Sequence, residues 1–344
     1  MPTPRHEVQG PVLPTGTHAA ISGREALRRA MSNRFRKFMY VDGNQIENAG
    51  NRIREDDIVN ASVNPKFQLS RGAKVFTIGS CFARNVEDKL ISHGVNVASR
   101  GFSLPREYYY KPSMHGPRTA LNKYSPHSIA FELDRVISGR SLENDGFVQV
   151  DDSLWYDPHC SQVVPRPLED CREVRAKVAG VTREIEDCDF VFVTLGLTET
   201  WIDNELNVPV NLPPKPNLLK RFPDRFGFSN ATYPSVVEAL ESTIDLVCKQ
   251  CNREMKFIFT VSPVPLQTTY SDVDVILANT YSKSVLRAAC GHLSAMHDNV
   301  DYFPSFEMLM YSNRRLVWRE DEVHIKNSAV GTVIQRFANS YLED

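Results

Sequence analysis

The chain of 344 residues is 42% hydrophobic and 24% charged, which is ordinary for a globular protein and long enough for a buried core. Its 40 Lys and Arg residues and 42 Asp and Glu residues give a net charge of −2, so no overall positive field draws it to nucleic acid or to an anionic membrane. Neither a membrane-length apolar run nor a secretory leader is visible, and seven irregularly spaced cysteines are a poor disulfide framework. These features predict a cytoplasmic protein with reduced thiols, no nucleic-acid partner and no transmembrane segment.

The first part of the chain differs in composition from the rest. Residues 1–70 are polar and begin with several prolines, and within them only segment 24–36 has the composition of a short basic helix. We expect residues 1–70 to form a partly irregular N-terminal extension and residues 71–344 to form a single main domain.

From Lys74 onward, short β-branched runs alternate with helical stretches. The strand candidates are 74–78, 95–98, 189–195, 256–261 and 300–303, and the helix candidates are 82–93, 172–186, 233–251, 284–297 and 327–341. Because strands alternate with helices, the pattern predicts an α/β fold with a parallel sheet and helices on both faces. The aromatic and proline-rich segments 102–170 and 209–223 are interpreted as irregular insertions, and we expect the first to cover the site.

Ser80 is the strongest candidate for a catalytic nucleophile. It follows a predicted strand directly, is preceded by Gly79 and leads into a helix, at the sheet edge where ligands of such folds bind. The helix N-terminus there offers backbone N–H groups to a developing oxyanion. A serine that only caps the helix occupies the same position, and Gly-Ser alone favours that interpretation. The neighbouring Cys81 is an alternative nucleophile, although a buried, inert thiol is the expected role.

The presence of His324 favours a catalytic role for Ser80 over a capping role alone. A serine hydroxyl needs a base within hydrogen-bond reach, and that base needs a carboxylate to orient it. Asp321 stands three residues before His324, a spacing that one tight loop can fold into contact. The two weak signals together predict Ser80 as nucleophile, His324 as base and Asp321 as its partner.

The segment Ile78-Gly-Ser-Cys-Phe-Ala83 resembles the motif that gives the GSCFA family its name, and this family is similar to a branch of the SGNH (GDSL-type) hydrolases. Further matches appear in the family's order and extend over roughly residues 70–340: they are Asn122-Lys-Tyr-Ser-Pro126, Ser128-Ile-Ala, Thr194-Leu-Gly-Leu-Thr-Glu-Thr-Trp201, Val261-Ser-Pro-Val-Pro265, Tyr302-Phe-Pro-Ser305 and the Asp-x-x-His block.

The resemblance implies a three-layer, flavodoxin-like SGNH-hydrolase fold and a serine-dependent ester reaction in residues 71–344. The family's second block supplies a glycine N–H to the oxyanion hole, and we assign this role to Gly101. In the third block Gly196 matches, but Thr198 stands where typical members have an asparagine that donates to the oxyanion. Glu199 and Trp201 of the same block are expected near the substrate, although Trp201 is equally suited to the core.

The predicted function is that of an esterase acting on an acylated carbohydrate or another small ester through acyl-Ser80. Two alternatives stay open: an acyltransferase that passes an acetyl group to a glycan hydroxyl, and a non-catalytic glycan- or partner-binding protein on the same fold. No group of His, Cys, Asp and Glu has metal-ligand spacing, since Cys248-Lys-Gln-Cys251 stands alone, so we expect no metal and no cofactor. The oligomeric state is left open.

Overall fold

The computed structural model describes residues 21–40, 48–113 and 116–343. The chain divides into two compact units, Met1–Asp56 and Asp57–Asp344. The described part of the first unit contains two short helices, α1 (Gly23–Ser32) and α2 (Ala49–Glu55), and neither buries a residue. Helix α1 begins one residue before the expected segment 24–36 and ends at Ser32, because Asn33 takes extended dihedral angles.

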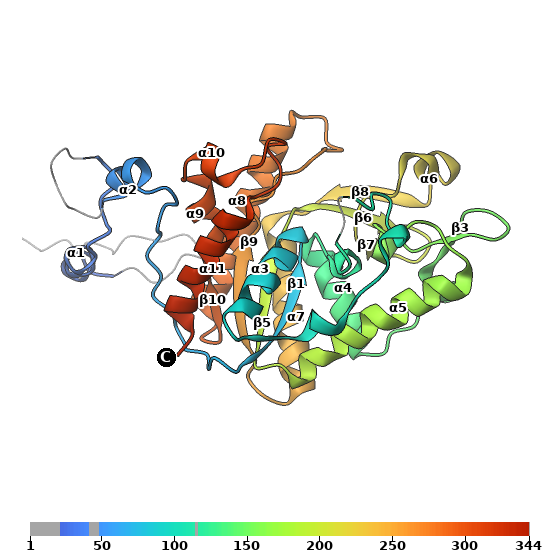
Figure 1. Cartoon of the computed structure of the whole chain (residues 1–344), viewed down its shortest axis with the longest axis horizontal. Coiled ribbons are helices and arrows are strands. Elements are labelled where there is room, and N and C mark those ends of the chain that lie inside the picture. Colours follow the sequence, from blue (N-terminus) through green and yellow to red (C-terminus); the bar gives the residue numbers. More distant parts are fainter. Residues whose placement is uncertain (1–20, 41–47, 114–115, 344) are drawn as a thin grey trace, which may run out of the picture. The chain divides into compact units, whose positions relative to one another are not determined.

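The second unit is built around a parallel sheet of five strands in the order β10-β9-β5-β1-β2 (Figure 1). The strands are β1 (Lys74–Gly79), β2 (Asn96–Val97), β5 (Phe190–Leu195), β9 (Lys256–Val261) and β10 (Val300–Tyr302). Read from β2, this order is the 2-1-3-4-5 order of flavodoxin-type sheets. The structure thus confirms the predicted α/β fold with its central parallel sheet.

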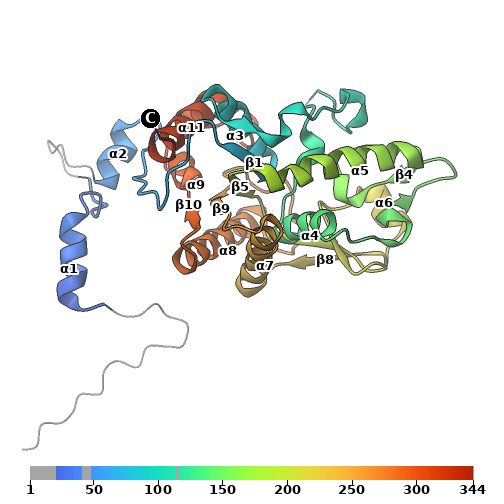
Figure 2. The ribbon, with the colours of Figure 1, turned by 90° about the horizontal axis from the view of Figure 1, so that it is seen from below.

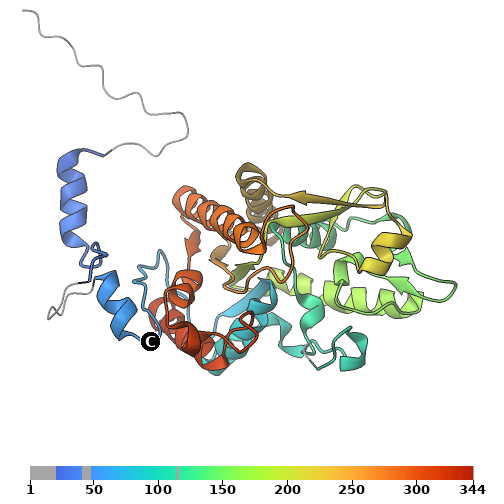
Figure 3. The same cartoon turned by 90° about the horizontal axis from the view of Figure 1, so that it is seen from above.

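Helices cover both faces of the sheet, because successive strand residues point to opposite sides. Phe192 packs on one face with α3 (Cys81–Ser92), α9 (Ser305–Met310) and α11 (Asn327–Tyr341), whereas Val193 packs on the other with α4 (Pro126–Ile137), α7 (Tyr233–Cys251) and α8 (Val275–Met296). Figures 2 and 3 show α3 and α11 on one side of the strands and α7 and α8 on the other. The main domain therefore has three layers.

The interpretation of segments 102–170 and 209–223 as irregular was wrong in part. The first contains α4, which begins with a capping box at Ser125 and Pro126 in its first turn, and the start of α5 (Leu168–Arg183). The remaining strands are β3 (Val148–Gln149), β4 (Trp155–Tyr156), β6 (Glu199–Asp203), β7 (Val208–Val210) and β8 (Phe226–Asn230). The other short α-helices are α6 (Pro216–Arg221) and α10 (Arg314–Val317). The 3₁₀ helices are η1 (Ala98–Gly101), η2 (Arg106–Tyr108), η3 (Thr119–Leu121), η4 (Glu143–Gly146), η5 (Pro158–Cys160) and η6 (Glu184–Asp187). Strands β7, β6 and β8 form a small antiparallel sheet.

The segment that leads into β1 is tied to the end of α11. The Leu69 N–H donates to the Tyr341 carbonyl at 2.8 Å, and the Glu343 N–H donates to the Leu69 carbonyl at 2.9 Å. Upstream, the Val59 N–H donates to the Ser312 hydroxyl at 2.7 Å. Residues 57–70, which the sequence places in the extension, therefore contact the same unit as the sheet.

The end of β1 approaches β5 so closely that only glycine fits. Gly79 has a φ of +141°, and a Cβ atom there would lie 2.1 Å from the Thr194 carbonyl oxygen. This close approach fixes the backbone immediately before Ser80.

We expect Gly79→Ala to destabilise the protein by about 3 kcal/mol or more, because both the dihedral strain and a backbone clash oppose the methyl group. Gly94→Ala is the matched control, since Gly94 has a φ of +83° but nothing within 4 Å of an added Cβ. That variant should lose only about 1–2 kcal/mol. Urea unfolding of both variants measures the difference, and equal losses would contradict the steric argument.

Candidate active site

A cavity of about 540 Å³ lies at the carboxyl ends of the central strands. Ser80 follows β1, Gly196 follows β5 and Ser262 follows β9, and all three residues line it. The chain leaves β1 and β5 at neighbouring positions where the strand order reverses, which is the point where open α/β sheets bind ligands. The topology therefore places the cavity where a substrate is expected.

Ser80 lies at the junction of β1 and α3. Its side chain is the N-cap of α3, and Oγ accepts a hydrogen bond from the Phe82 N–H at 3.3 Å. Its own N–H donates to the Thr194 carbonyl at 3.0 Å. The residue is 2% exposed but borders the cavity. The positive end of the α3 dipole thus faces the space beside the hydroxyl.

His324 is held by Asp321 within one tight loop. The imidazole Nδ1 lies 2.7 Å from Asp321 Oδ2, and the His324 N–H donates to Oδ1 at 2.9 Å. Glu322 makes the turn with a φ of +56°. The backbone N–H of His324, the imidazole and the backbone N–H of Val323 together lower the pKa of the Asp321 carboxyl well below its usual range. The carboxylate therefore stays ionised and fixes the ring.

Ser80 and His324 line the same cavity, although they are 244 positions apart in the chain (324 − 80). No hydrogen bond joins their side chains in the described part of the chain, where Ser80 Oγ accepts a hydrogen bond from the Phe82 N–H. With Nδ1 turned to Asp321, Nε2 of His324 is the nitrogen left for the cavity. In structures without substrate, catalytic hydrogen bonds are often long and shorten only in the complex.

Gly196 brings the backbone after β5 against the serine. A Cβ atom at Gly196 would lie 2.7 Å from the Tyr124 carbonyl oxygen and 3.2 Å from Ser80 Cβ. Its N–H donates to that same carbonyl at 3.1 Å, so the amide proton is already used. Gly196 therefore shapes the cavity floor by its lack of a side chain.

The structure does not bring Gly101 or Thr198 to the cavity wall. Gly101 is an exposed residue at the end of η1. Thr198 is fully buried, its hydroxyl donates to Asn230 Oδ1 at 2.7 Å and its N–H donates to the Ser282 hydroxyl at 2.9 Å. The physical reason is the β6–β8 pairing, which sets Asn230 opposite the neighbouring residue Glu199 and within reach of the threonine.

Glu199 and Trp201, in contrast, both line the cavity. The Glu199 carboxylate accepts hydrogen bonds from the Thr269 hydroxyl and from the Tyr270 N–H. The Trp201 ring meets the Tyr270 ring edge to face, with centroids 4.8 Å apart. Trp201 and Tyr270 thus form an aromatic part of the cavity wall, and Trp201 is at the same time 6% exposed and part of a small core.

Asn122 is a site residue to which sequence reasoning gave no role. It forms a bridge with Gly79, and the next residue, Lys123, donates its N–H to the Gly79 carbonyl at 2.8 Å. The Asn122 side chain is buried in the cavity wall, and its Nδ2 donates to the Tyr124 hydroxyl at 3.2 Å. Its Oδ1 has no partner in the described chain. The only earlier signal was its place in the Asn-Lys-Tyr-Ser-Pro motif.

Lys283 of α8 is a buried cation behind the cavity floor. Its Nζ donates to the Gly196 carbonyl at 2.6 Å and to the Val264 carbonyl at 2.8 Å, so it links the loops that follow β5 and β9. Burial lowers the pKa of the Lys283 ammonium to about 7. Burial also raises the pKa of the Cys81 thiol, with Lys283 acting in the opposite direction. A thiol with a raised pKa is a poor nucleophile at neutral pH.

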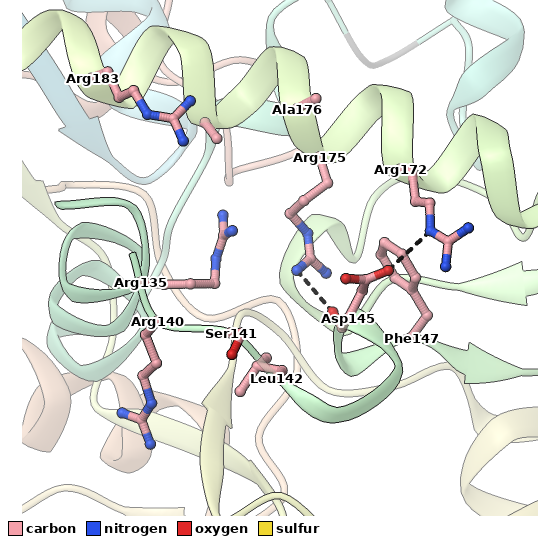
Figure 4. A pocket seen from close by; sticks show the side chains of 11 residues that line it. Arg135, Arg140, Ser141, Leu142, Asp145, Phe147, Arg172, Arg175, Ala176 and Arg183 are labelled. Atoms are coloured by element: carbon pink, nitrogen blue, oxygen red, sulfur yellow. Dashed lines mark hydrogen bonds and ion pairs between the residues drawn. The ribbon is translucent and has the colours of Figure 1, made fainter. Parts of the chain in front are cut away.

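A second cavity, of about 380 Å³, is lined by residues of α4, α5 and the segment that follows α4 (Figure 4). Five arginines line it, and four of them have carboxylate partners; the pairs are Arg135–Glu132, Arg140–Asp134, Arg172–Asp145 and Arg175–Asp157. These charges are largely matched within the chain: Arg135 and Arg140 pair with carboxylates of α4, whereas Arg172 and Arg175 link α5 to η4 and to the N-cap of η5.

Neither a metal-binding cluster nor a membrane-spanning helix is present within residues 21–40, 48–113 and 116–343. Among these residues no group of three or more His, Cys, Asp and Glu side chains could hold a metal ion. No helix in the same ranges combines the length and the apolarity that a membrane crossing requires.

The amino-acid sequence matches a known family over most of the chain. The sequence model of the GSCFA family matches residues 74–337, from the first residue of β1 into α11. The chain belongs to the GSCFA family. This match confirms the resemblance seen in the sequence, and it includes Ser80, Asn122, Asp321 and His324 of the GSCFA domain. No protein with a curated description matches the chain.

The buried ammonium of Lys283 predicts a pH dependence of stability. In the unfolded chain a lysine titrates near ~10.4, so between about pH 7 and 10 the unfolded state binds more protons than the folded state. The free energy of unfolding should therefore rise with pH through this window, by roughly 3 kcal/mol relative to Lys283→Met. Urea unfolding of both proteins from pH 7 to 10 measures this, and a difference that stays constant with pH would exclude the assignment.

Proposed function

We propose that this GSCFA protein is a serine-dependent O-acyl ester hydrolase that acts on an acylated carbohydrate or a similar small ester. The observation that carries the proposal is one cavity bordered by both Ser80 at a helix N-terminus and His324, whose Nδ1 lies 2.7 Å from a carboxylate. We also propose residues 71–344 as the catalytic domain. A volume of about 540 Å³ suits a ligand of the size of an acylated sugar.

In the first half of the reaction, Ser80 Oγ attacks the carbonyl carbon of the ester. His324 Nε2 takes the serine proton as the new C–O bond forms, and Asp321 stabilises the resulting imidazolium. The tetrahedral intermediate collapses, the bond to the leaving alcohol breaks, and His324 returns the proton to that alcohol. Acyl-Ser80 remains.

In the second half, water gives a proton to His324 and attacks the acyl carbonyl. Collapse of this intermediate breaks the bond to Ser80 Oγ, which recovers its proton from His324, and the carboxylic acid leaves. A glycan hydroxyl in place of water would convert the same chemistry into acyl transfer. Analysis of the products in the presence of a sugar acceptor distinguishes the two outcomes.

For the oxyanion, we propose the Asn122 side-chain amide together with the N-terminal end of α3. Asn122 borders the cavity, and one of its two Nδ2 protons remains after the bond to Tyr124. The N–H groups of Ser80, Gly196 and Thr198 already donate to protein acceptors, which argues against them in the present geometry. An amide from another segment thus takes the role that an asparagine has in the third SGNH block.

Ser80→Ala and His324→Ala should each lower kcat/KM for an aryl acetate by at least about 10³–10⁴-fold. The double variant should be no slower than the slower single variant, because the two residues act as a unit. Initial rates with the three purified proteins test this. Strictly additive losses would remove His324 from the mechanism.

Loss of a helix cap must be separated from loss of the nucleophile in this experiment. Ser22→Ala is the matched control, since Ser22 caps α1 by accepting from the Glu25 N–H at 3.2 Å and lies in the other unit. Each serine-to-alanine change should cost about 1 kcal/mol of stability as a cap. Only Ser80→Ala should abolish turnover, and an active Ser80→Ala protein would show that Ser80 is a cap alone.

Asn122→Ala should lower kcat by about 10²–10³-fold with little change in KM, because an oxyanion donor acts mainly in the transition state. Asn85→Ala provides the control, as Asn85 also lines the cavity and has no assigned role. Steady-state kinetics on a neutral acetate ester measure both. A change in KM alone for Asn122→Ala would assign the amide to substrate binding instead.

A further inference from the structure

We infer that the cavity beside Ser80 binds an anionic group, carried by the part of the substrate that does not react, between the ammonium groups of Lys111 and Lys215. This inference rests on the proposed function, because it names the class of substrate for the same cavity. The ligand would be an acylated sugar that bears a carboxylate or a phosphate.

The two lysines reach the cavity from distant parts of the chain. Lys111 follows η2 by three residues, and Lys215 is the N-cap residue of α6. Both line the cavity that Ser80 and His324 also line. The Lys215 ammonium sits over the Tyr110 ring, with Nζ 4.6 Å from the ring centroid, and this cation–π contact holds it at the wall.

Neither lysine has a carboxylate partner in the described part of the chain. By contrast, the buried Arg84 pairs with Glu87 at 2.8 Å, and Arg118 pairs with Glu87 and Asp88, so these two cations are neutralised. Arg319, which also lines the cavity, donates to Asn327 Oδ1 at 3.5 Å. Glu199 accepts hydrogen bonds from Thr269 and from the Tyr270 N–H rather than from a lysine. A chain with a net charge of −2 thus concentrates unbalanced positive charge at this cavity.

The two ammonium groups also act against each other. Burial, and after it the positive charge of Lys111, lowers the pKa of Lys215. Two like charges held together without a counter-ion raise the energy of the empty cavity, and an anion between them removes that repulsion. The empty state is therefore less favourable than the state with an anion bound.

The kind of anion follows from the kind of cation. An ammonium group is a compact charge with three rotatable donors, whereas the guanidinium fork selects planar carboxylates by its geometry. A lysine pair therefore recognises negative charge without a strong preference for shape. Since an ester group is neutral, the charge must lie elsewhere on the substrate, as in an acylated uronic acid or an acylated sugar phosphate.

The test is equilibrium binding of three unreactive sugars to the full-length wild-type protein, namely glucuronate, glucose 6-phosphate and glucose, followed by NMR at low salt. We expect at least one anionic sugar to bind about tenfold more tightly than glucose, and Lys111→Gln and Lys215→Gln each to reduce that affinity about tenfold. Added salt should weaken the anionic sugars alone. Equal binding of all three sugars, or no binding of either anion, would overturn the inference.

Two further variants make the result specific. Lys220→Gln removes the same charge from the exposed face of α6, outside the cavity, and should leave the affinities unchanged. Lys215→Arg keeps the charge and should retain most of the binding, whereas an affinity as low as that of Lys215→Gln would contradict a charge-based site. Thermal unfolding verifies that each variant is folded.

Binding of the sugars does not depend on turnover, so the two proposals fail separately. Charge-selective binding by a protein in which Ser80→Ala leaves ester hydrolysis unchanged would refute the serine mechanism and retain the anion site. Serine-dependent hydrolysis without charge-selective binding would retain the mechanism and refute the anion site.

Discussion

The contact between the ends of β1 and β5 is the constraint on which the rest of the structure depends. Gly79 presses against the Thr194 carbonyl, and Gly196 presses against Ser80, so two backbones meet where side chains would normally keep them apart. This contact ends β1 at the position where α3 must begin, and it turns the Ser80 hydroxyl toward the cavity. The wall segment at Asn122 and the link through Lys283 are both built onto these same residues.

The residues that line the cavity come both from the ends of the sheet strands and from segments outside the sheet. The sheet supplies Ser80 and the glycines, whereas segments outside it supply the wall residues, including Asn122 and the lysine pair. The residue after Asn122, Lys123, is 2% exposed, and its ammonium lies 3.1 Å from the Glu132 carboxylate in α4. Burial favours protonation of that carboxyl, but Lys123 and Arg135 lower the pKa of Glu132 to about 2. The buried ion pair between Lys123 and Glu132 thus fixes the position of the segment that contains Asn122.

The parts of the fold with a regular local pattern could be predicted from the sequence. Helices α7 and α11 and strand β9 have the predicted bounds, because apolar residues recur at helical spacing in the two helices and form a nearly continuous run in the strand. The pattern failed where buried residues are polar. Helix α8 begins at Val275 rather than at residue 284, since Ser282 and Lys283 are buried and interrupt the apolar stripe. Buried Ser128 and Glu132 hide α4 in the same way. The side-chain partner of Thr198 and the backbone bridge partner of Asn122 come from other segments, so spacing along the chain could not reveal them.

The tie between Leu69 and the end of α11 bears on how the chain is made. A ribosome releases all five strands of the sheet before it releases α11, which covers Phe192 and the rest of one sheet face. Leu69 emerges early in this unit and finds its backbone partners, Tyr341 and Glu343, only after α11 has been made. Until α11 is made, α3 and α9 cover only part of this hydrophobic face of the sheet, and an incompletely covered apolar face is the kind of surface that chaperones hold.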